Sequence, residues 1–407
     1  MDIIVQKYGG SSVADSQRIR AVADRIIKTK EQGNKVAVVV SAMGKSTDNL
    51  IKQAKEINPN PPEREMDMLL STGEQISIAL LAMAIKARGY DVVSLTGSQA
   101  GIHTDDFYNK ARIVSINSER MKAEFDDDKI VIVAGFQGIN NKNDITTLGR
   151  GGSDTTAVAL CAALQGKKCE IYTDVDGVYT EDPRFVKNVK KINEITYDEM
   201  LTLASQGAKV LHPRCVELAK IYNIDLEVRS SFNYNMGTIV KEKTNMEKEI
   251  VVTAIAHNLN MVKLSIYGIP DVPGIASKIF GALAKNKVNV SLISQSSGEN
   301  GTNTISFITS ESDRDKAGKV LEATLIELDG KKISALDNLA IVTVVGAGMI
   351  TNPGVASELF SVMGENNINI EMISSSEISI SIAIHQEDCQ RAVDILAKQF
   401  NLVEFDN

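Results

Sequence analysis

Two glycine-rich turns in the sequence each carry a cation and are suited to binding an anion. The first is at residues 7–12 (KYGGSS) and the second at residues 149–154 (GRGGSD). Glycines let the backbone approach a ligand closely, and N–H groups at a helix start converge on phosphate or carboxylate oxygens. Lys7 adds a point charge, whereas Arg150 can clamp a carboxylate in two-point geometry. Either turn alone is also typical of an ordinary strand-to-helix connection, but together they favour an anion-handling site.

Further polar residues near the ends of predicted elements could complete such a site. In residues 173–184 (TDVDGVYTEDPR) a strand ends in polar turn residues, followed by an aromatic and a cation. This segment can bracket the ribose, base and phosphates of a nucleotide, and it can equally be a surface loop. Ser41, Thr47 and Glu74 lie near other element ends. A carboxylate at Glu74 would select a ligand ammonium group if it faces a pocket, and it would be unremarkable if it faces solvent.

Several common nucleotide-binding signatures are absent. The sequence contains no GxxxxGK[ST] loop, no GxGxxG after its first strand, and no HRD or DFG motif. These absences argue against a P-loop enzyme, a dinucleotide-binding fold and a protein kinase.

Composition narrows the remaining classes. A chain of 407 residues favours two or three domains, and its net charge of −8 argues against a nucleic-acid backbone as partner. The four cysteines and four histidines are scattered, so we expect a reduced protein without a metal centre of its own. The sequence opens on a strand without a signal-peptide pattern, and no apolar run approaches the roughly 20 residues of a membrane span. We therefore expect a cytoplasmic protein with no membrane partner.

The elements that must position these residues alternate between strands and helices. We predict strands at residues 3–6, 36–40, 92–94, 130–134, 170–173 and 225–228. A helix from about Ser16, capped by Asp15 or Ser16, buries Ile19, Val22 and Ile26, and an apolar helix spans residues 74–88. This alternation predicts an α/β sheet with helices on both sides.

The last third of the chain contains an internal repeat. Residues 269–297 align without gaps to residues 349–377, and Pro273-Gly274 falls on Pro353-Gly354. Each copy reads strand, Pro-Gly turn, amphipathic helix, strand, turn, strand, helix. The polar stretch 233–249 before it suits a linker, and we expect the apolar residues 250–255 to pair into one of the sheets of the repeat. A duplicated structural unit without a ligand is the simpler alternative.

These segments, taken in order, resemble the amino-acid kinase superfamily and, within it, the aspartate kinases. The matching motifs are KYGGSS, VVSAMG (39–44), STGEQ (71–75), GFQG (135–138), GRGGSDTTA (149–157), TDVDGVYTEDPR and GAKVLHPR (207–214), and the repeat resembles a tandem pair of ACT modules. The resemblance covers essentially the whole chain. It implies an α/β three-layer αβα sandwich at residues 1–232, a linker at 233–261, and two ferredoxin-like (βαββαβ) ACT modules at 262–338 and 339–407.

The resemblance also implies an activity. The chain would transfer the γ-phosphoryl of ATP to L-aspartate, the first step of lysine, threonine and methionine biosynthesis, under feedback by an end product. Mg²⁺ would be carried by ATP, with no protein metal ligand assigned. A carboxylate is already ionised at pH 7, so the reaction needs alignment and charge stabilisation rather than a general base.

The roles implied for single residues follow the motifs. Lys7, Arg150 and Asp154 would be catalytic. The aspartate pocket would contain Ser41, Thr47, Glu74, Phe136, Arg150, Gly151, Gly152 and Ser153. The ATP site would contain Lys7, Tyr8, Gly9, Gly10, Thr173, Asp174, Tyr179, Arg184, Lys209 and Val210.

The ACT resemblance implies regulation and assembly. Lysine, alone or with threonine, would bind near Asp271, Gly274, Asn289 and Gln295, or near Asn352, Gly354 and Asn369. Such pockets form where modules of two chains pair, so we expect a homodimer or a dimer of dimers.

Two other functions stay open on the sequence. A kinase of the same fold acting on glutamate or N-acetylglutamate is the alternative within the enzyme class, although Glu74 and the tandem tail favour a free amino acid such as aspartate. A catalytically idle amino-acid sensor is the alternative outside it, and the presence of Lys7, Arg150 and Asp154 argues against it. Because the second repeat reaches residue 407, we expect no fused homoserine dehydrogenase.

Overall fold

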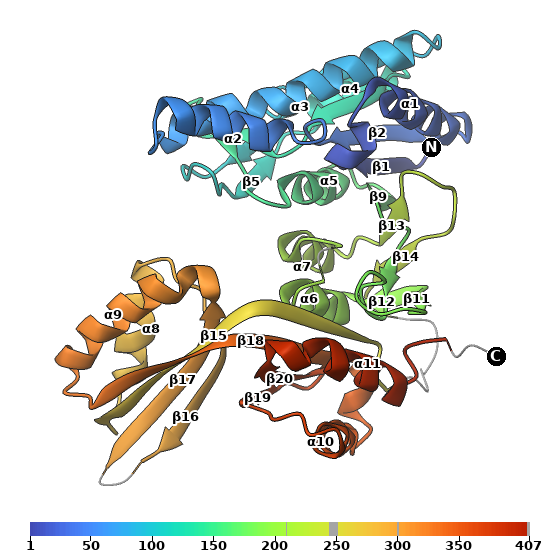
Figure 1. Cartoon of the computed structure of the whole chain (residues 1–407). Coiled ribbons are helices and arrows are strands. Elements are labelled where there is room, and N and C mark those ends of the chain that lie inside the picture. The colour runs from blue at the N-terminus through green and yellow to red at the C-terminus, as the bar shows by residue number, and fades with distance from the viewer. Residues whose placement is uncertain (209, 244–250, 299–300, 405–407) are drawn as a thin grey trace. The chain divides into compact units, whose positions relative to one another are not determined.

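The computed structural model describes residues 1–208, 210–243, 251–298 and 301–404, and the chain forms two compact units (Figure 1). The first unit comprises Met1–Val178, Lys191–Ser205 and Lys209–Met246. The second comprises Tyr179–Lys190, Gln206–Ala208 and Glu247–Asn407. Two short segments from the middle of the sequence therefore belong to the unit that contains the repeat. Two short strands, β10 (Val178–Tyr179) and β11 (Lys191–Ile192), lie at the two boundaries of the first of these segments.

The first unit is built on an eight-stranded sheet in the order β12-β14-β13-β9-β1-β2-β6-β3. Neighbouring strands run parallel, except for the antiparallel pair β13 and β14. The central strand β2 is buried over five of its six residues (KVAVVV), as expected for a parallel strand covered on both faces. The strands are β1 (Ile3–Tyr8), β2 (Lys35–Val40), β3 (Val92–Leu95), β6 (Ile130–Ala134), β9 (Lys168–Thr173), β12 (Glu194–Thr196), β13 (Leu226–Ser230) and β14 (Thr238–Lys241).

Helices cover both faces of this sheet and complete a three-layer αβα sandwich. Helices α1 and α3 pack together on one face, whereas α5 packs against β1, β2 and β9 and also contacts α7 (Figure 1). Asp15 caps α1 by accepting the Arg18 N–H at 2.9 Å, one of the two caps expected from the sequence. The helices are α1 (Ser16–Glu31), α2 (Ser46–Ile57), α3 (Glu63–Lys86), α4 (Glu119–Asp126), α5 (Gly152–Ala163), α6 (Tyr197–Ser205) and α7 (Pro213–Tyr222).

Helix α3 begins eleven residues before the predicted helix at 74–88 and ends at Lys86. By length and composition its 24 residues could cross a membrane, which corrects the expectation that no segment of the chain is long and apolar enough. Its residues Ile78, Leu81 and Ile85 instead pack into the core beneath α1 and the central strands. A core helix of this kind passes the same test as a membrane span.

A smaller four-stranded sheet, in the order β5-β4-β7-β8, adjoins the carboxyl end of β6. Its strands are β4 (Ile102–Thr104), β5 (Ile113–Ile116), β7 (Gln137–Ile139) and β8 (Ile145–Thr147). The antiparallel hairpin β7–β8 leads directly into the glycine-rich turn at 149–152 and then into α5. This hairpin therefore sets where Arg150 lies.

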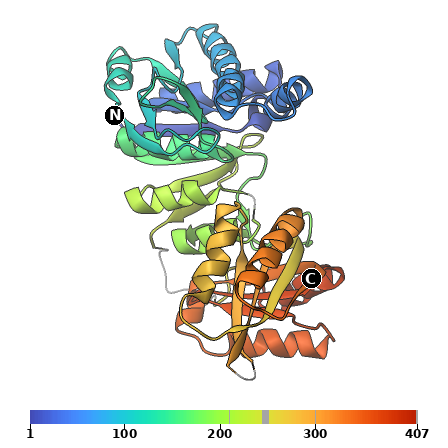
Figure 2. The same cartoon turned by 90° about the vertical axis from the view of Figure 1, so that its left-hand side faces the viewer.

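The two copies of the repeat share one six-stranded sheet in the order β16-β17-β15-β18-β20-β19. The strands are β15 (Ala254–Pro270), β16 (Ser291–Ser297), β17 (Thr302–Ser310), β18 (Lys332–Val345), β19 (Met372–Ser375) and β20 (Ser379–His385). The helices are α8 (Ile275–Lys285), α9 (Arg314–Glu327), α10 (Val355–Glu365) and α11 (Cys389–Gln399). Figures 1 and 2 both show α8 and α9, the two helices of the first copy, side by side.

Strands β15 and β18 each serve both copies, which the repeat alone did not predict. The second half of β15 pairs with β17 and with the first half of β18. The first half of β15 pairs with the second half of β18, which also pairs with β20. The register shifts near Asn260 and Asn338, both of which adopt positive φ angles of 58°, mark where each strand passes from one copy to the other.

The segment between the predicted catalytic domain and the repeat differs in part from the expected linker. Strand β14 lies inside the stretch 233–249 that was expected to be a linker, and it pairs with β12 and β13 of the first unit. Ala254 and Ile255 pair with Val345 and Val344, which confirms that this apolar segment joins a sheet of the repeat. Ile250 lies outside the described residues.

Candidate active site

The two glycine-rich turns line one cavity of about 1810 Å³ in the first unit. Lys7 reaches it from the carboxyl end of β1, and Arg150 reaches it from the turn between β8 and α5. The other predicted site residues in its wall are Gly10, Ser41, Thr47, Glu74, Phe136, Gly151, Gly152, Ser153 and Asp154. The whole predicted aspartate pocket and all three predicted catalytic residues therefore face one space.

The phosphate-binding half of the cavity is built around an ion pair. The Lys7 ammonium lies 2.6 Å from Oδ1 of Asp154, and both side chains are largely buried. Asp154 lies in the first turn of α5, and Gly152 and Ser153 at the start of that helix line the same space. A helix N-terminus beside a lysine attracts an anion, while the carboxylate can hold a cation that travels with it.

Glycine is required at several points of the turn that carries Arg150. Gly151 adopts φ of 69°, and a Cβ atom there would lie 2.2 Å from the ring of His212. A Cβ atom on Gly152 would lie 2.9 Å from both Phe136 and Leu148. The tight fit leaves the exposed Arg150 guanidinium in the cavity without a carboxylate partner in the described part of the chain. It can therefore receive a ligand carboxylate.

Glu74 faces the cavity from the middle of α3 and is only 3% exposed. Its Oε1 accepts the Ala42 N–H at 3.0 Å, whereas its buried Oε2 has no hydrogen-bond partner within the described ranges. Burial raises the pKa of Glu74 to about 7, against the smaller effect of backbone hydrogen bonds. An incomplete hydrogen-bond shell on a buried carboxylate is unfavourable unless a ligand completes it.

Asp67, which sequence reasoning missed, fixes the backbone on which Arg150 is carried. This fully buried carboxylate accepts hydrogen bonds from Thr147 N–H at 2.9 Å, Thr147 O–H at 2.6 Å and Asn109 N–H at 2.9 Å. Burial raises the pKa of Asp67, although these hydrogen bonds favour its ionised form. Thr147 is the last residue of β8, so the contacts anchor the start of the turn.

Arg214 and His212, also missed, hold the turn from the other side. Arg214 donates to the carbonyls of Leu148 at 2.7 Å and Ala111 at 3.1 Å. His212 caps α7 through Nδ1, which accepts the Arg214 N–H at 3.3 Å, and burial lowers the pKa of His212 so that its ring is neutral at pH 7. The motif GAKVLHPR contains both residues, but only spatial proximity to Gly151 reveals their role.

The predicted ATP residues are not all gathered at this cavity. The Tyr8 ring is fully buried and stacks on Tyr172 at 4.8 Å, so only its backbone is available to a ligand. Gly9 donates its N–H to the Tyr172 carbonyl at 3.2 Å, next to Thr173 and the exposed Asp174 at the end of β9. Val210 is part of the first unit, and Lys209 lies outside the described residues. Tyr179 and Arg184 belong to the second unit, so their role stays a prediction.

The predicted effector residues occupy matching turns of the two copies. Gly274 and Gly354 precede α8 and α10 with φ of 95° and 117°, so both Pro-Gly turns use a conformation that glycine favours. Within the second unit the Asp271 carboxylate accepts from Asn303 at 2.7 Å, and the Asn369 amide donates to Glu371 at 2.8 Å. All seven residues are exposed, the others being Asn289, Gln295 and Asn352. Their role as an effector site stays a prediction.

Comparison with known proteins identifies two kinds of domain in the chain. Residues 2–230 match the model of the amino acid kinase family, and residues 264–325 and 342–400 match an ACT domain. The chain is 49% identical to an aspartokinase of Bacillus sp. (strain MGA3), over 99% of this chain and 98% of that one. It resembles E. coli aspartokinase III in complex with aspartate and ADP (R-state), with a TM-score of 0.80 and 27% identity over 98% and 99% of the two chains. The same enzyme in complex with lysine and aspartate (T-state) gives a TM-score of 0.74 and 27% identity over 99% and 100%.

Proposed function

The chain belongs to the amino acid kinase family, and from this premise we propose that it transfers the γ-phosphoryl of ATP to the side-chain carboxylate of L-aspartate. The observation that carries the proposal is the pair of unsatisfied charges in one cavity. Arg150 lacks a carboxylate partner, and Glu74 has a buried oxygen without a donor, in each case among the described residues. An α-amino acid supplies the carboxylate and the ammonium that would complete them.

The two ends of aspartate then have different tasks. Arg150 binds the α-carboxylate, Glu74 binds the ammonium, and Ser41, Thr47 and Phe136 shape the rest of the pocket. The side-chain carboxylate stays unbound by Arg150 and points toward Lys7. This division excludes N-acetylated substrates, because an acetylated nitrogen carries no positive charge for Glu74.

The reaction requires only positioning and charge stabilisation. One oxygen of the aspartate side chain forms a bond to the γ-phosphorus, the bond from that phosphorus to the β–γ bridging oxygen breaks, and ADP leaves with the electron pair. No proton is removed, because the attacking carboxylate is ionised at pH 7. Lys7 and the N-terminus of α5 stabilise the negative charge on the phosphoryl oxygens.

The same residues fit Mg²⁺ bound to ATP. Asp154 is the acid of the cavity that pairs with Lys7. When the nucleotide phosphates bind Lys7 in its place, Asp154 would hold the metal directly or through water. Mg²⁺ supplies charge neutralisation of the phosphates when bound. The proposal places the protein in the cytoplasm, where ATP and free aspartate are available and where its four buried thiols stay reduced.

An ATP-dependent hydroxamate assay tests the activity. With aspartate, ATP, Mg²⁺ and hydroxylamine we expect aspartyl hydroxamate, because hydroxylamine attacks the acyl phosphate and releases phosphate. With glutamate or N-acetylglutamate as acceptor we expect none. Equal turnover of N-acetylglutamate would contradict the role of Glu74. Absence of product with all three acceptors would contradict the proposed function.

We propose further that an amino-acid effector, lysine alone or with threonine, binds at the turns before α8 and α10. The exposed edge strand β16, on which Ile293 is 52% exposed, would pair with a second chain and complete the pocket near Gln295. A homodimer or a dimer of dimers would result. The lysine-bound state of E. coli aspartokinase III supports an effector of this kind.

Initial rates with lysine, threonine and both together test the regulation. We expect inhibition by at least one of these conditions, and Asn289→Ala should weaken it without changing the uninhibited rate. Sedimentation of the wild type should give a mass of two or four chains of 44.1 kDa each. A monomer at assay concentration would contradict the pairing, and indifference to both amino acids would contradict the effector site.

A further inference from the structure

A second cavity of about 530 Å³ lies in the first unit and is lined by the second half of α1 and by residues of β1, β9 and β13. Helix α1 contributes Arg25 and Lys28, and Ile4 contributes from the start of β1. Lys7 of the active-site cavity is near the other end of the same strand. No motif in the sequence pointed to this cavity, and the proposed kinase reaction does not use it.

The wall of this cavity is basic although the chain is acidic. Its two acidic side chains are Asp2 and Glu170. Five of its side chains carry a positive charge, namely Arg25, Lys28, Lys167, Lys168 and Arg229. The chain as a whole has a net charge of −8. A local excess of positive charge on an acidic protein indicates a partner that is itself an anion.

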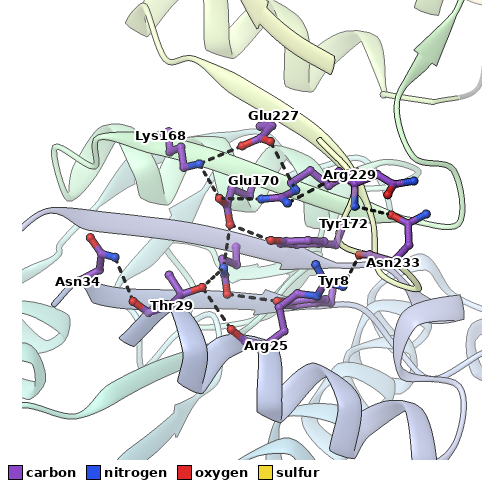
Figure 3. Close-up of polar contacts among 12 residues, drawn as sticks. Tyr8, Arg25, Thr29, Asn34, Lys168, Glu170, Tyr172, Glu227, Arg229 and Asn233 are labelled. Carbon is purple, nitrogen blue, oxygen red and sulfur yellow. Dashed lines mark hydrogen bonds and ion pairs between the residues drawn. The ribbon is translucent and has the colours of Figure 1, made fainter. Parts of the chain in front are cut away.

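The acidic residues are already committed to some of these cations. Asp2 accepts from Lys167 at 2.6 Å. Glu170 accepts from Lys168 at 2.7 Å and from Tyr172 at 3.1 Å (Figure 3). It also accepts from Gln6 at 2.8 Å. Lys168 also reaches Glu227 at 2.9 Å. These contacts pair Lys167 and Lys168 with carboxylates, and Arg229 lies 3.8 Å from Glu170 and 3.5 Å from Glu227. The two cations of α1, Arg25 and Lys28, are left without an ion pair among the described residues.

Arg25 is the most informative of these cations. It is only 6% exposed, and its Nη2 donates to the carbonyls of Asn233 at 2.5 Å and Ser231 at 3.4 Å. Its Cζ lies 4.9 Å from the ring centre of Tyr172 and 4.2 Å from that of Tyr234. Within the described ranges no carboxylate comes within ion-pair distance of it. A buried charge held only by carbonyls and rings is costly, and a bound anion would offset that cost.

Lys28 lies one helical turn beyond Arg25 on the same face of α1. Its ammonium lies 4.8 Å from the Tyr234 ring centre, and across the described residues it makes no ion pair. Two neighbouring cations without counter-ions suit a ligand with two negative charges. A phosphate monoester carries about one and a half to two negative charges at pH 7, and inorganic phosphate is partly a dianion at this pH.

We propose that this cavity is a binding site for a phosphate-type dianion, held by Arg25 and Lys28 and separate from the catalytic site. The volume has room for a small organic group attached to the phosphate, with Tyr234 as a ring surface for it. Inorganic phosphate and a phosphate monoester share this chemistry. The site depends on neither the kinase activity nor its effectors.

Isothermal titration calorimetry on the full chain tests the site. Inorganic phosphate and glucose 6-phosphate are the two probes, and the active-site cavity is first saturated with aspartate, Mg²⁺ and a non-hydrolysable ATP analogue. We expect at least one probe to bind, with an affinity that falls as ionic strength rises. Tighter binding of glucose 6-phosphate would assign a phosphate ester, and binding of phosphate alone would assign the free ion.

Matched variants locate the binding. Lys28 is exposed, so Lys28→Met should fold normally, and we expect it to weaken the probe at least about tenfold, as for the loss of one charged hydrogen bond. Lys122→Met removes one exposed charge from α4, outside both cavities, and should leave binding unchanged. Equal affinity in Lys28→Met and the wild type, or no binding of either probe to the wild type, would overturn the proposal.

Discussion

Two glutamates of the first unit are equally buried but have opposite environments. Glu74 at the active-site cavity is 3% exposed and Glu170 at the basic cavity is 4% exposed. Both oxygens of Glu170 have partners, whereas Oε2 of Glu74 has none in the described chain. Burial raises the pKa of Glu74 to about 7. Burial alone would also raise the pKa of Glu170, but Lys168, Gln6 and Arg229 hold it below its usual value.

This difference indicates that Glu74 is available to bind a ligand, whereas Glu170 stabilises the fold. A buried charge with complete partners can stabilise the strands around it, while one with a missing partner costs stability until a ligand arrives. Substitutions at the two glutamates should therefore differ in their effects. Replacing Glu74 should lower activity and raise stability, whereas replacing Glu170 should lower stability and leave activity nearly unchanged.

The largest effect should follow from removing the unpaired cation or the ion pair at the active-site cavity. Lys7→Ala or Arg150→Ala should lower kcat/KM for aspartate on the order of 10³-fold, because each removes charge stabilisation or alignment in the transition state. The thermal melting temperature should change little for Arg150→Ala, since Arg150 is exposed and makes no ion pair with any described residue. Near-normal turnover in either variant would contradict the role of that residue.

Glu74→Gln should come next and should change activity and stability in opposite directions. We expect KM for aspartate to rise about 100-fold, because the ammonium loses a charged partner. In the wild type KM should rise as pH falls below 7, where Glu74 is protonated, and the variant should lack this dependence. Initial rates between pH 6 and 8 measure both.

The expected gain in stability follows from the direction in which folding shifts the pKa of Glu74. A carboxyl whose pKa is raised by folding keeps its proton in the native state, so the wild type loses stability as pH rises from the unfolded value of about 4.5 to about 7. Glu74→Gln removes that loss. Its melting temperature at pH 8 should exceed that of the wild type, and a lower value would contradict the idea of an unsatisfied carboxylate.

Asp67→Asn should have an intermediate effect, because Asp67 acts through the backbone rather than on the substrate. We expect KM for aspartate to rise about tenfold with KM for ATP nearly unchanged, since the displaced turn carries Arg150 and not Lys7. Steady-state kinetics in both substrates give this split. A uniform loss of kcat with both KM values unchanged would indicate general damage instead.

The smallest effect on activity should come from Glu170→Gln. We expect kcat/KM within about twofold of the wild type, because no substrate contact is involved. We expect a loss of stability on the order of 1 to 2 kcal/mol at pH 7, because the half-buried Lys168 loses a charged partner and keeps Glu227. The pKa of Glu170 is lowered by folding, so its stabilisation is present above the unfolded pKa and is lost as pH falls through the folded one. The difference in melting temperature between the wild type and Glu170→Gln should therefore be smaller at pH 4 than at pH 7.

The sequence predicted the residues whose chemistry is local and failed where chemistry depends on distant partners. Lys7 and Arg150 were identifiable because each stands inside a glycine-rich turn, and both reach the same cavity. Asp67 and Arg25 were not, because an acid or an arginine on a helix looks the same whether it faces solvent or a buried backbone. Their roles come from Thr147 and Asn233, 80 and 208 residues away.

The fold shows the same limit. The αβα sandwich was predictable from alternating strands and helices, but β14 was missed because Asn, Gly and Lys surround its short apolar core. The early start of α3 was missed although the run Pro59-Asn60-Pro61-Pro62 before Glu63 is typical of a helix beginning. The repeat indicated two like modules, but an alignment of the copies does not say which half of a long strand pairs with which copy.

The exchange of β15 and β18 between the copies has a consequence for how the regulatory half can evolve. Neither copy can be excised, duplicated again or replaced by a foreign module without breaking the pairing of the other, because each long strand belongs to both copies of the shared six-stranded sheet. A substitution near Asn260 or Asn338 would therefore change both copies at once. Changes in effector preference should therefore arise by point substitution in the turns and not by module shuffling.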